Sequence, residues 1–76
     1  MYTVEKVTID GSILIGSTVH AAVVKSIIEN HFKIAIDNLK KVESKGYRVI
    51  RTYQLNATTK IIIKKYDDNL VGSASI

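Results

Sequence analysis

The N-terminal residues alternate between apolar and polar side chains with a period of two. Residues 2–9 are rich in β-branched side chains, which predicts a strand. Asp10-Gly11 follows, a dipeptide typical of the type I′ turn of a tight hairpin. Residues 12–15 (Ser-Ile-Leu-Ile) then predict a short returning strand that ends at Gly16. The chain is therefore expected to begin with a β-hairpin.

The middle of the chain changes to a helical period. Charged residues of alternating sign recur at every fourth position, which predicts a solvated stripe: Lys25, Glu29, Lys33, Asp37 and Lys41. The opposite side is apolar and is the predicted core face: Val24, Ile27, Ile28, Phe32, Ala35, Leu39 and Val42. Lys45-Gly46 predicts the end of the helix.

Two starting points fit the helix. Ser26 begins a stretch with capping-box spacing to Glu29, which would leave residues 19–24 to extend a strand. A start near Ser17 or Thr18 keeps the apolar phase unbroken, and the two alanines after His20 support it. We favour the early start.

Beyond Gly46 the period returns to two. Residues 47–55 and 58–66 predict two strands joined by a turn at Asn56-Ala57. In this register Tyr53 faces Lys60, and Ile61 and Ile63 point toward the helix. The segment 67–76 shows no clear period and is predicted to be a flexible C-terminal tail.

This order of elements, β-β-α-β-β, predicts an α+β fold of two layers, in which a small and mostly antiparallel sheet packs on one long helix. A chain of 76 residues fits one domain, assigned to residues 1–66. The absence of cysteine excludes disulfides and a cysteine-ligated zinc. The start of the chain lacks a signal-peptide pattern, and no apolar run approaches the ~20 residues of a membrane span, so we expect a cytoplasmic protein that does not enter membranes.

Glycines and hydroxyl residues between Gly11 and Thr18 match the spacing of a phosphate-binding P-loop. That loop needs a lysine after its second glycine to reach the terminal phosphates, and Ser17 stands at this place. We interpret the two glycines as a turn residue and a strand end.

Two histidines carry the next candidate chemistry. His20 and His31 are eleven residues apart, which on one helix is roughly 16 Å along the axis. They cannot share a metal ion, and no metal site is predicted. The apolar arc of the predicted helix is wider than one sheet covers, which predicts a second copy of the helix and hence a homo-oligomer; the alternative is a sheet that curves further round the helix. The expected interface comprises His20, Ile27, His31, Ile34 and Asn38.

The formal net charge of +4 arises largely from residues 46–66, which carry five cations and no acid. The outer face of the predicted C-terminal hairpin combines cations with aromatic rings in a candidate binding face: Tyr47, Arg51, Tyr53, Lys60, Lys64 and Tyr66. Such a face suits an acidic protein surface, and equally suits stacking and phosphate contacts with nucleic acid. A third interpretation is a solvated face that binds nothing.

Catalytic constellations are missing from the sequence: there is no cysteine nucleophile, no Ser-His-acid set at suggestive spacing, and no carboxylate pair on one element. We therefore expect a non-enzymatic binding or regulatory protein without a cofactor, such as a phage or bacterial accessory inhibitor that occupies a host protein surface. The alternatives are a nucleic-acid-binding module that uses the same face, and an oligomer that sequesters a small phosphorylated nucleotide.

Overall fold

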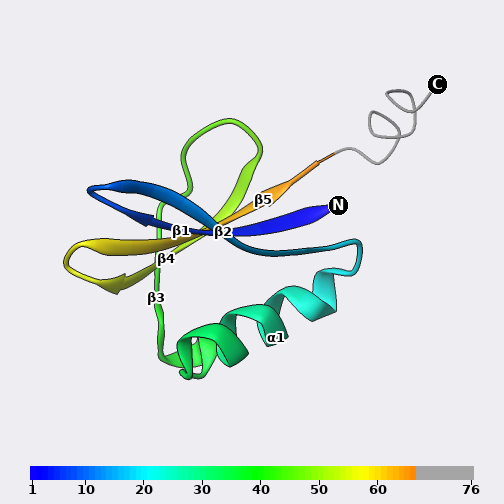
Figure 1. The fold of residues 1–76 in the computed structure, drawn as a ribbon, viewed down its shortest axis with the longest axis horizontal. Helices are drawn as coiled ribbons and strands as arrows, with labels where there is room; N and C mark the ends of the chain where they lie inside the picture. The colour runs from blue at the N-terminus through cyan, green and yellow to red at the C-terminus, as the bar shows by residue number, and fades with distance from the viewer. Residues whose placement is uncertain (67–76) are drawn as a thin grey trace.

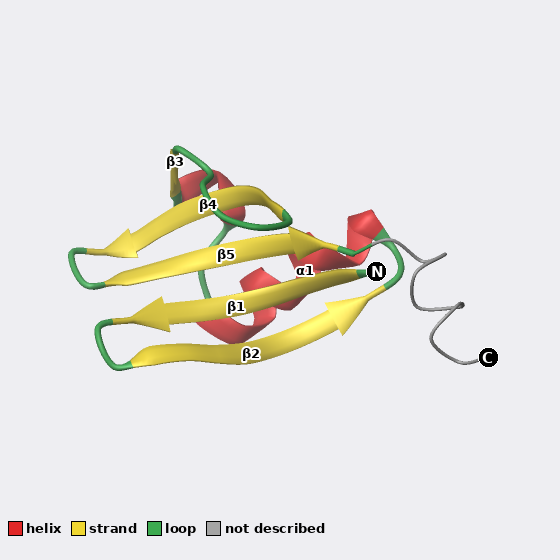
Figure 2. Ribbon diagram, turned by 90° about the horizontal axis from the view of Figure 1, so that it is seen from above, coloured by secondary structure: helices red, strands yellow, loops and turns green. Residues whose placement is uncertain are grey.

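The computed structural model describes residues 1–66, and the predicted tail at 67–76 lies outside the described residues. The elements follow in the order β1 (Tyr2–Thr8), β2 (Gly11–Thr18), α1 (Ala21–Phe32), a 3-10 turn η1 (Ile36–Asn38), β3 (Lys40–Val42), β4 (Val49–Asn56) and β5 (Thr59–Lys65). The strands form one antiparallel sheet in the order β2-β1-β5-β4-β3, and α1 covers one of its faces (Figures 1 and 2). The predicted α+β class, an antiparallel sheet on one helix, is confirmed.

The predicted first hairpin forms, but its second strand continues past the predicted end at Gly16 to Thr18, and its turn differs from the predicted one. Thr8 pairs with Gly11, so Ile9 and Asp10 occupy the turn. Neither of these two residues has a positive φ, as a type I′ turn would require; the positive φ falls on Gly11, at 129°. The type I′ prediction is therefore wrong. Gly11 is the first residue after the turn, and it is this residue that adopts the positive φ.

Helix α1 begins early, as favoured above, and not at Ser26. His20 is its N-cap residue, and the Thr18 hydroxyl accepts a hydrogen bond from the His20 backbone N–H at 3.1 Å. The helix is only 12 residues long, because Lys33 adopts the left-handed conformation (φ 57°, ψ 39°) and its N–H closes the last turn on the Glu29 carbonyl. The predicted continuation of the helix to Lys45 is wrong.

The segment after α1 crosses the sheet to reach its other edge. Helix α1 packs on β1 and β2, whereas β3 lies at the edge beyond β4. The Glu29 carboxylate accepts a hydrogen bond from the Ile36 backbone N–H at 2.8 Å and so fixes the exit from the helix. This path lets Ile34 and Ile36 pack against the core and buries Leu39. A longer helix would carry these apolar side chains away from β4.

The core lies between α1 and the central strands. Its buried residues come from every layer of the structure: Val4, Val24, Ile28, Leu39, Tyr53, Ile61 and Ile63. Ile61 and Ile63 face the helix as predicted, opposite Tyr53 and Val4 respectively. Because neighbouring strand residues point to opposite faces, these positions fix which side chains of β4 and β5 point away from α1.

The second hairpin is shifted by one residue from the predicted register. The turn contains Ala57 and Thr58, because the Asn56 Oδ1 accepts hydrogen bonds from the Thr58 backbone N–H and hydroxyl at 3.0 and 3.1 Å. Strand β4 then has a register shift between Gln54 and Asn56, so Tyr53 pairs with Ile61, not Lys60. A slip of one residue turns a side chain to the other face of the sheet.

Candidate functional site

We call the face of the sheet opposite α1 the open face. Two of the six predicted binding residues, both on β5, lie on it. Lys60 and Lys64 alternate with the buried Ile61 and Ile63 and so point away from the helix. Lys60 is exposed, and Lys64 is half-buried.

Tyr53 and Arg51 lie on the other face, which corrects the predicted binding face. Tyr53 is 7% exposed and belongs to the core. Arg51 pairs with Ile63 on the helix side, where its Nη1 donates a long hydrogen bond to the Tyr53 hydroxyl at 3.4 Å. The six residues do not form a common face, because the moved turn and the register shift between Gln54 and Asn56 together change the pairing of β4 with β5 by one residue.

Tyr47 and Tyr66 come together through a residue that sequence reasoning missed. The segment between β3 and β4 rises on the open side of the sheet (Figure 1). Within it, the Arg48 guanidinium lies 4.8 Å from the centre of the Tyr47 ring and 5.4 Å from that of Tyr66. The Arg48 carbonyl accepts a hydrogen bond from the Lys65 backbone N–H at 2.9 Å, which holds this cluster against β5. The adjacent Tyr47-Arg48 pair is the only local feature of the sequence that indicates this cluster. The positive φ of 64° at Arg48 cannot be predicted from it.

Lys64 forms an ion pair on the open face. Its Nζ lies 3.0 Å from the Glu5 Oε2 on the neighbouring strand β1. The hydrogen bond to the Glu5 carboxylate raises the pKa of Lys64 above the ordinary lysine value, and the negative charge of Glu5 adds to this effect. The pair largely neutralises Lys64, so Lys60 and Arg48 carry more of the uncompensated positive charge than the sequence predicts.

Cross-strand pairing arranges the open face in rows. One edge row is polar and basic: Lys40, Gln54 and Lys60, continuing to Val7 on β1. The middle row is largely apolar: Val42, Thr52, Ile62 and Leu14, with Glu5 between the last two. The other edge row contains Lys64 beside the Tyr47–Arg48–Tyr66 cluster. An apolar centre flanked by polar and charged residues is the usual composition of a protein–protein interface.

A shallow hollow of about 270 Å³ adjoins Lys60 at the end of the sheet where both hairpins turn. It is lined by Val7, Thr8, Ile9, Gln54, Ala57, Thr58 and Lys60. Small-molecule sites usually occupy about 300–1,000 Å³, so this hollow suits a single side chain of a partner better than a free ligand. Its apolar walls and cationic rim favour an apolar residue beside a carboxylate.

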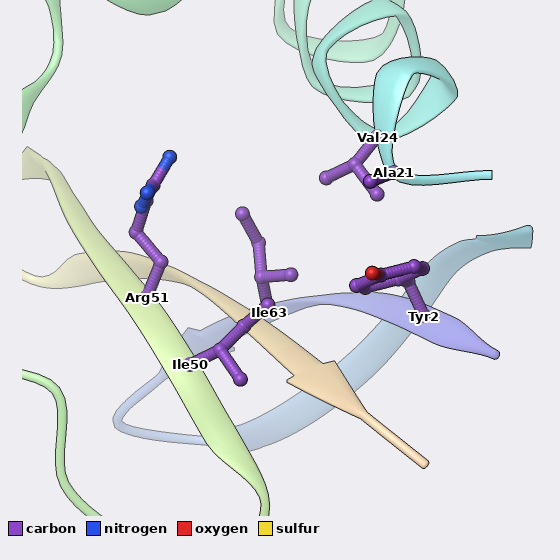
Figure 3. Close-up of a pocket in the computed structure, with 6 residues that line it drawn as sticks. All are labelled: Tyr2, Ala21, Val24, Ile50, Arg51 and Ile63. Atoms are coloured by element: carbon purple, nitrogen blue, oxygen red, sulfur yellow. The ribbon is translucent and has the colours of Figure 1, made fainter. Parts of the chain in front are cut away.

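A second pocket of about 200 Å³ lies beneath the first turn of α1 (Figure 3). Its lining combines apolar side chains with one cation: Tyr2, Ala21, Val24, Ile50, Arg51 and Ile63. Arg51 reaches from β4 toward the helix side, and the Tyr2 ring forms the opposite wall (Figure 3). This pocket is smaller still and lies on the face away from Lys60 and Arg48.

The five predicted interface residues do not share one helical face, which is a second correction. Only Ile27 and His31 lie within α1; His20 caps it, and Ile34 and Asn38 lie beyond its end. Ile27 is half-buried over Gly16 of β2, and His31 stacks edge-on against Phe32 with ring centres 4.7 Å apart. The wide apolar arc arises because residues 34–42 were assigned to a helix that ends at Phe32.

Residues 1–66 contain no group of three or more His, Asp or Glu side chains placed to bind a metal ion. Within the same residues, no helix has both the length and the apolar character needed to cross a membrane. No family model, curated protein or solved structure matches the chain.

Proposed function

We propose that this chain is a non-enzymatic binding protein that uses its open face to bind an acidic and partly apolar surface of a partner protein. Such occupancy would regulate or inhibit the partner, as expected of a small cytoplasmic accessory protein of a phage or bacterium. One observation carries the proposal: the open face has an apolar middle row with cations on both sides.

Charge supports the acidic partner. The β4–β5 region, residues 46–66, contains no acid, and Glu5 is the only carboxylate in the rows of the open face. Glu5 is already paired with Lys64, so it does not oppose Lys60 or Arg48. Complementary charges speed association and exclude wrong partners, while aromatic and arginine side chains commonly contribute most of the binding energy.

Nucleic acid is the second candidate, and the Arg48 cluster favours it. Exposed tyrosines can stack on bases, and Tyr47 is 79% exposed. However, the rings of both tyrosines already contact Arg48, and the middle row of the face is largely apolar. Both features fit a protein surface better than a phosphate backbone.

Adjacent lysines of β3 provide a matched test. Lys40 pairs with Gln54 and faces the open side, whereas Lys41 pairs with the core residue Tyr53 and faces the helix side. Binding peptides are first selected from a random display library with the wild-type chain, and we expect them to contain acidic residues next to apolar ones. Lys40→Glu and Lys60→Glu should then weaken binding at least about tenfold, which corresponds to about 1.4 kcal/mol. Lys41→Glu changes the net charge equally and should leave the affinity within about twofold.

Calorimetry or fluorescence anisotropy gives these affinities. Equal affinity in the wild type, Lys40→Glu and Lys60→Glu would rule out the open face as the docking surface. The nucleic-acid alternative is tested with labelled single-stranded DNA and RNA oligomers. Binding that falls steeply with salt, regardless of sequence, would replace the protein partner with nucleic acid.

A further inference from the structure

The two edges of the sheet differ sharply. At one edge, β3 has three residues, two of them lysines, which is how proteins commonly prevent a sheet edge from pairing. At the other edge, β2 has eight residues and no charged side chain. Each of the other four strands in the described residues carries at least one charge. Strand β2 therefore lacks the charged side chains that commonly protect an edge.

Apolar side chains are exposed on both faces of this edge. Ile13 pairs with Lys6 and lies on the helix side, and Leu14 pairs with Glu5 and lies on the open face. Their exposed fractions are 62% and 61%. A long edge strand with exposed apolar residues is a template for pairing with another strand.

The apolar surface continues onto the helix. Ile27 covers Gly16 so closely that a Cβ there would lie 3.1 Å from the Ile27 Cγ2 atom. Val23, one helical turn before Ile27, is 40% exposed. Pairing at β2 would thus add apolar burial beneath the sheet to the backbone hydrogen bonds of the new ladder.

We propose that β2 pairs in antiparallel orientation with β2 of a second copy, across a two-fold axis near Ile13 and Leu14. In a two-fold interface a residue near the axis faces its own copy, so a strand that pairs with itself must carry no charge there. The uncharged β2 meets this condition in a chain whose net charge is +4, whereas the lysine-bearing β3 does not. A foreign strand, in contrast, would find no charge on β2 to select it.

A β-bulge determines which part of the edge pairs. Val4 pairs with Gly16 and Glu5 with Leu14, so Ile15 has no partner on β1 and the strand is irregular there. The longer regular stretch is Gly11–Leu14, and it contains the two exposed apolar residues Ile13 and Leu14. The axis therefore belongs on this side of the bulge.

Sedimentation equilibrium of the wild-type chain tests the proposal first. We expect a monomer–dimer equilibrium with a dissociation constant on the order of 10 μM, as for a small interface. Leu14→Lys places two ammonium groups near the axis and should raise this constant at least about tenfold. Ile9→Lys adds the same charge at the hairpin turn, where Ile9 is 88% exposed, and should leave the dimer intact.

Cross-linking provides a second test that does not depend on the lysine variant folding. Because the chain has no cysteine, a single introduced cysteine reports on its own symmetry mate. Cysteine at Ile13 or at Leu14, whichever of the two lies at the axis and faces its own copy, should form a disulfide-linked dimer under mild oxidation, since facing residues of an antiparallel pair have Cα atoms about 4.5–5.5 Å apart. Lys40→Cys on the β3 edge should not.

Three results would overturn the proposal: a wild-type monomer at about 1 mM, well above the expected constant; cross-linking at Lys40→Cys equal to that at β2; or oligomers larger than a dimer, because a two-fold pair closes on itself. Sedimentation and cross-linking measure only the association of two copies, and they do not depend on whether the open face binds a peptide. Failure of the dimer therefore leaves the proposed function standing, and the reverse also holds.

Discussion

Neighbouring residues on β5 show how strongly the two faces of the sheet differ. Ile61 is fully buried beneath α1, whereas Ile62 is half-buried on the open face. We expect Ile61→Val to lower the free energy of unfolding by about 1 kcal/mol, because the lost methylene leaves a cavity in a packed core. The same change at Ile62 should cost less than about 0.5 kcal/mol. Urea denaturation followed by circular dichroism measures both, and equal losses would contradict the assignment of the faces.

The ion pair between Lys64 and Glu5 makes the stability of the fold depend on pH in the alkaline range. The pKa of Lys64 is raised in the folded state, so the stabilisation from this pair is complete below the unfolded value of 10.5 and is lost as the pH rises through the folded value. A double-mutant cycle with Glu5→Gln and Lys64→Met should give a coupling of roughly 0.5–1 kcal/mol at pH 8. The coupling should shrink above pH 10.5. A coupling that stays constant at alkaline pH would show that packing, and not charge, joins the two side chains.

The end of α1 is the least expected element boundary. Lys33 is left-handed without being a glycine, a conformation that costs an ordinary residue about 1 kcal/mol or more. Lys33→Gly should therefore raise the free energy of unfolding by about 0.5 kcal/mol, after allowing for the greater freedom of glycine in the unfolded chain. Lys25→Gly makes the same change inside the helix and should lower it by about 1 kcal/mol. Thermal unfolding of the two variants would shift in opposite directions, and a loss in both would show that Lys33 has a further role.

Elements with a clear local period could be predicted from the sequence. The alternation of residues 2–9 and 58–66 predicts β1 and β5, and the phase around Val24 and Ile28 predicts the early helix. The end of that helix could not be predicted, because the charge period continues through Lys33 and no glycine interrupts it. The helix ends there because Ile34, Ile36 and Leu39 pack into the core, and this tertiary contact is not visible in the local sequence.

Predicting the candidate site requires the exact register of the strands, whereas predicting the elements does not. The turn at Asn56 and the register shift between Gln54 and Asn56 together set the register of β4 and β5 and place Tyr53 inside the core. The predicted positive charge does lie on this hairpin, but Arg51 and Lys60 point to opposite faces. The Arg48 cluster joins residues 47 and 66, so no local pattern could reveal it.

At the scale of the whole molecule, the proposed dimer would place two copies of the proposed binding face together. A two-fold axis normal to the sheet keeps both helices on one side and both open faces on the other. The dimer would then present a sheet of ten strands, twice the five of one copy, with two basic faces side by side. Linked sites bind a partner that spans both more tightly than either site alone.

The pairing of β1 with β5 also determines when this fold can form. Tyr2 lies opposite Lys65, so the central ladder of the sheet joins the two most distant strands in the chain. Closing so large a loop is entropically costly, which slows folding relative to proteins built from local contacts. During synthesis, the first hairpin and α1 leave the ribosome before β5 can cover Val4. The nascent chain thus passes through a period in which the uncharged β2 edge and half of the core are exposed together, and in which assistance from chaperones would matter most.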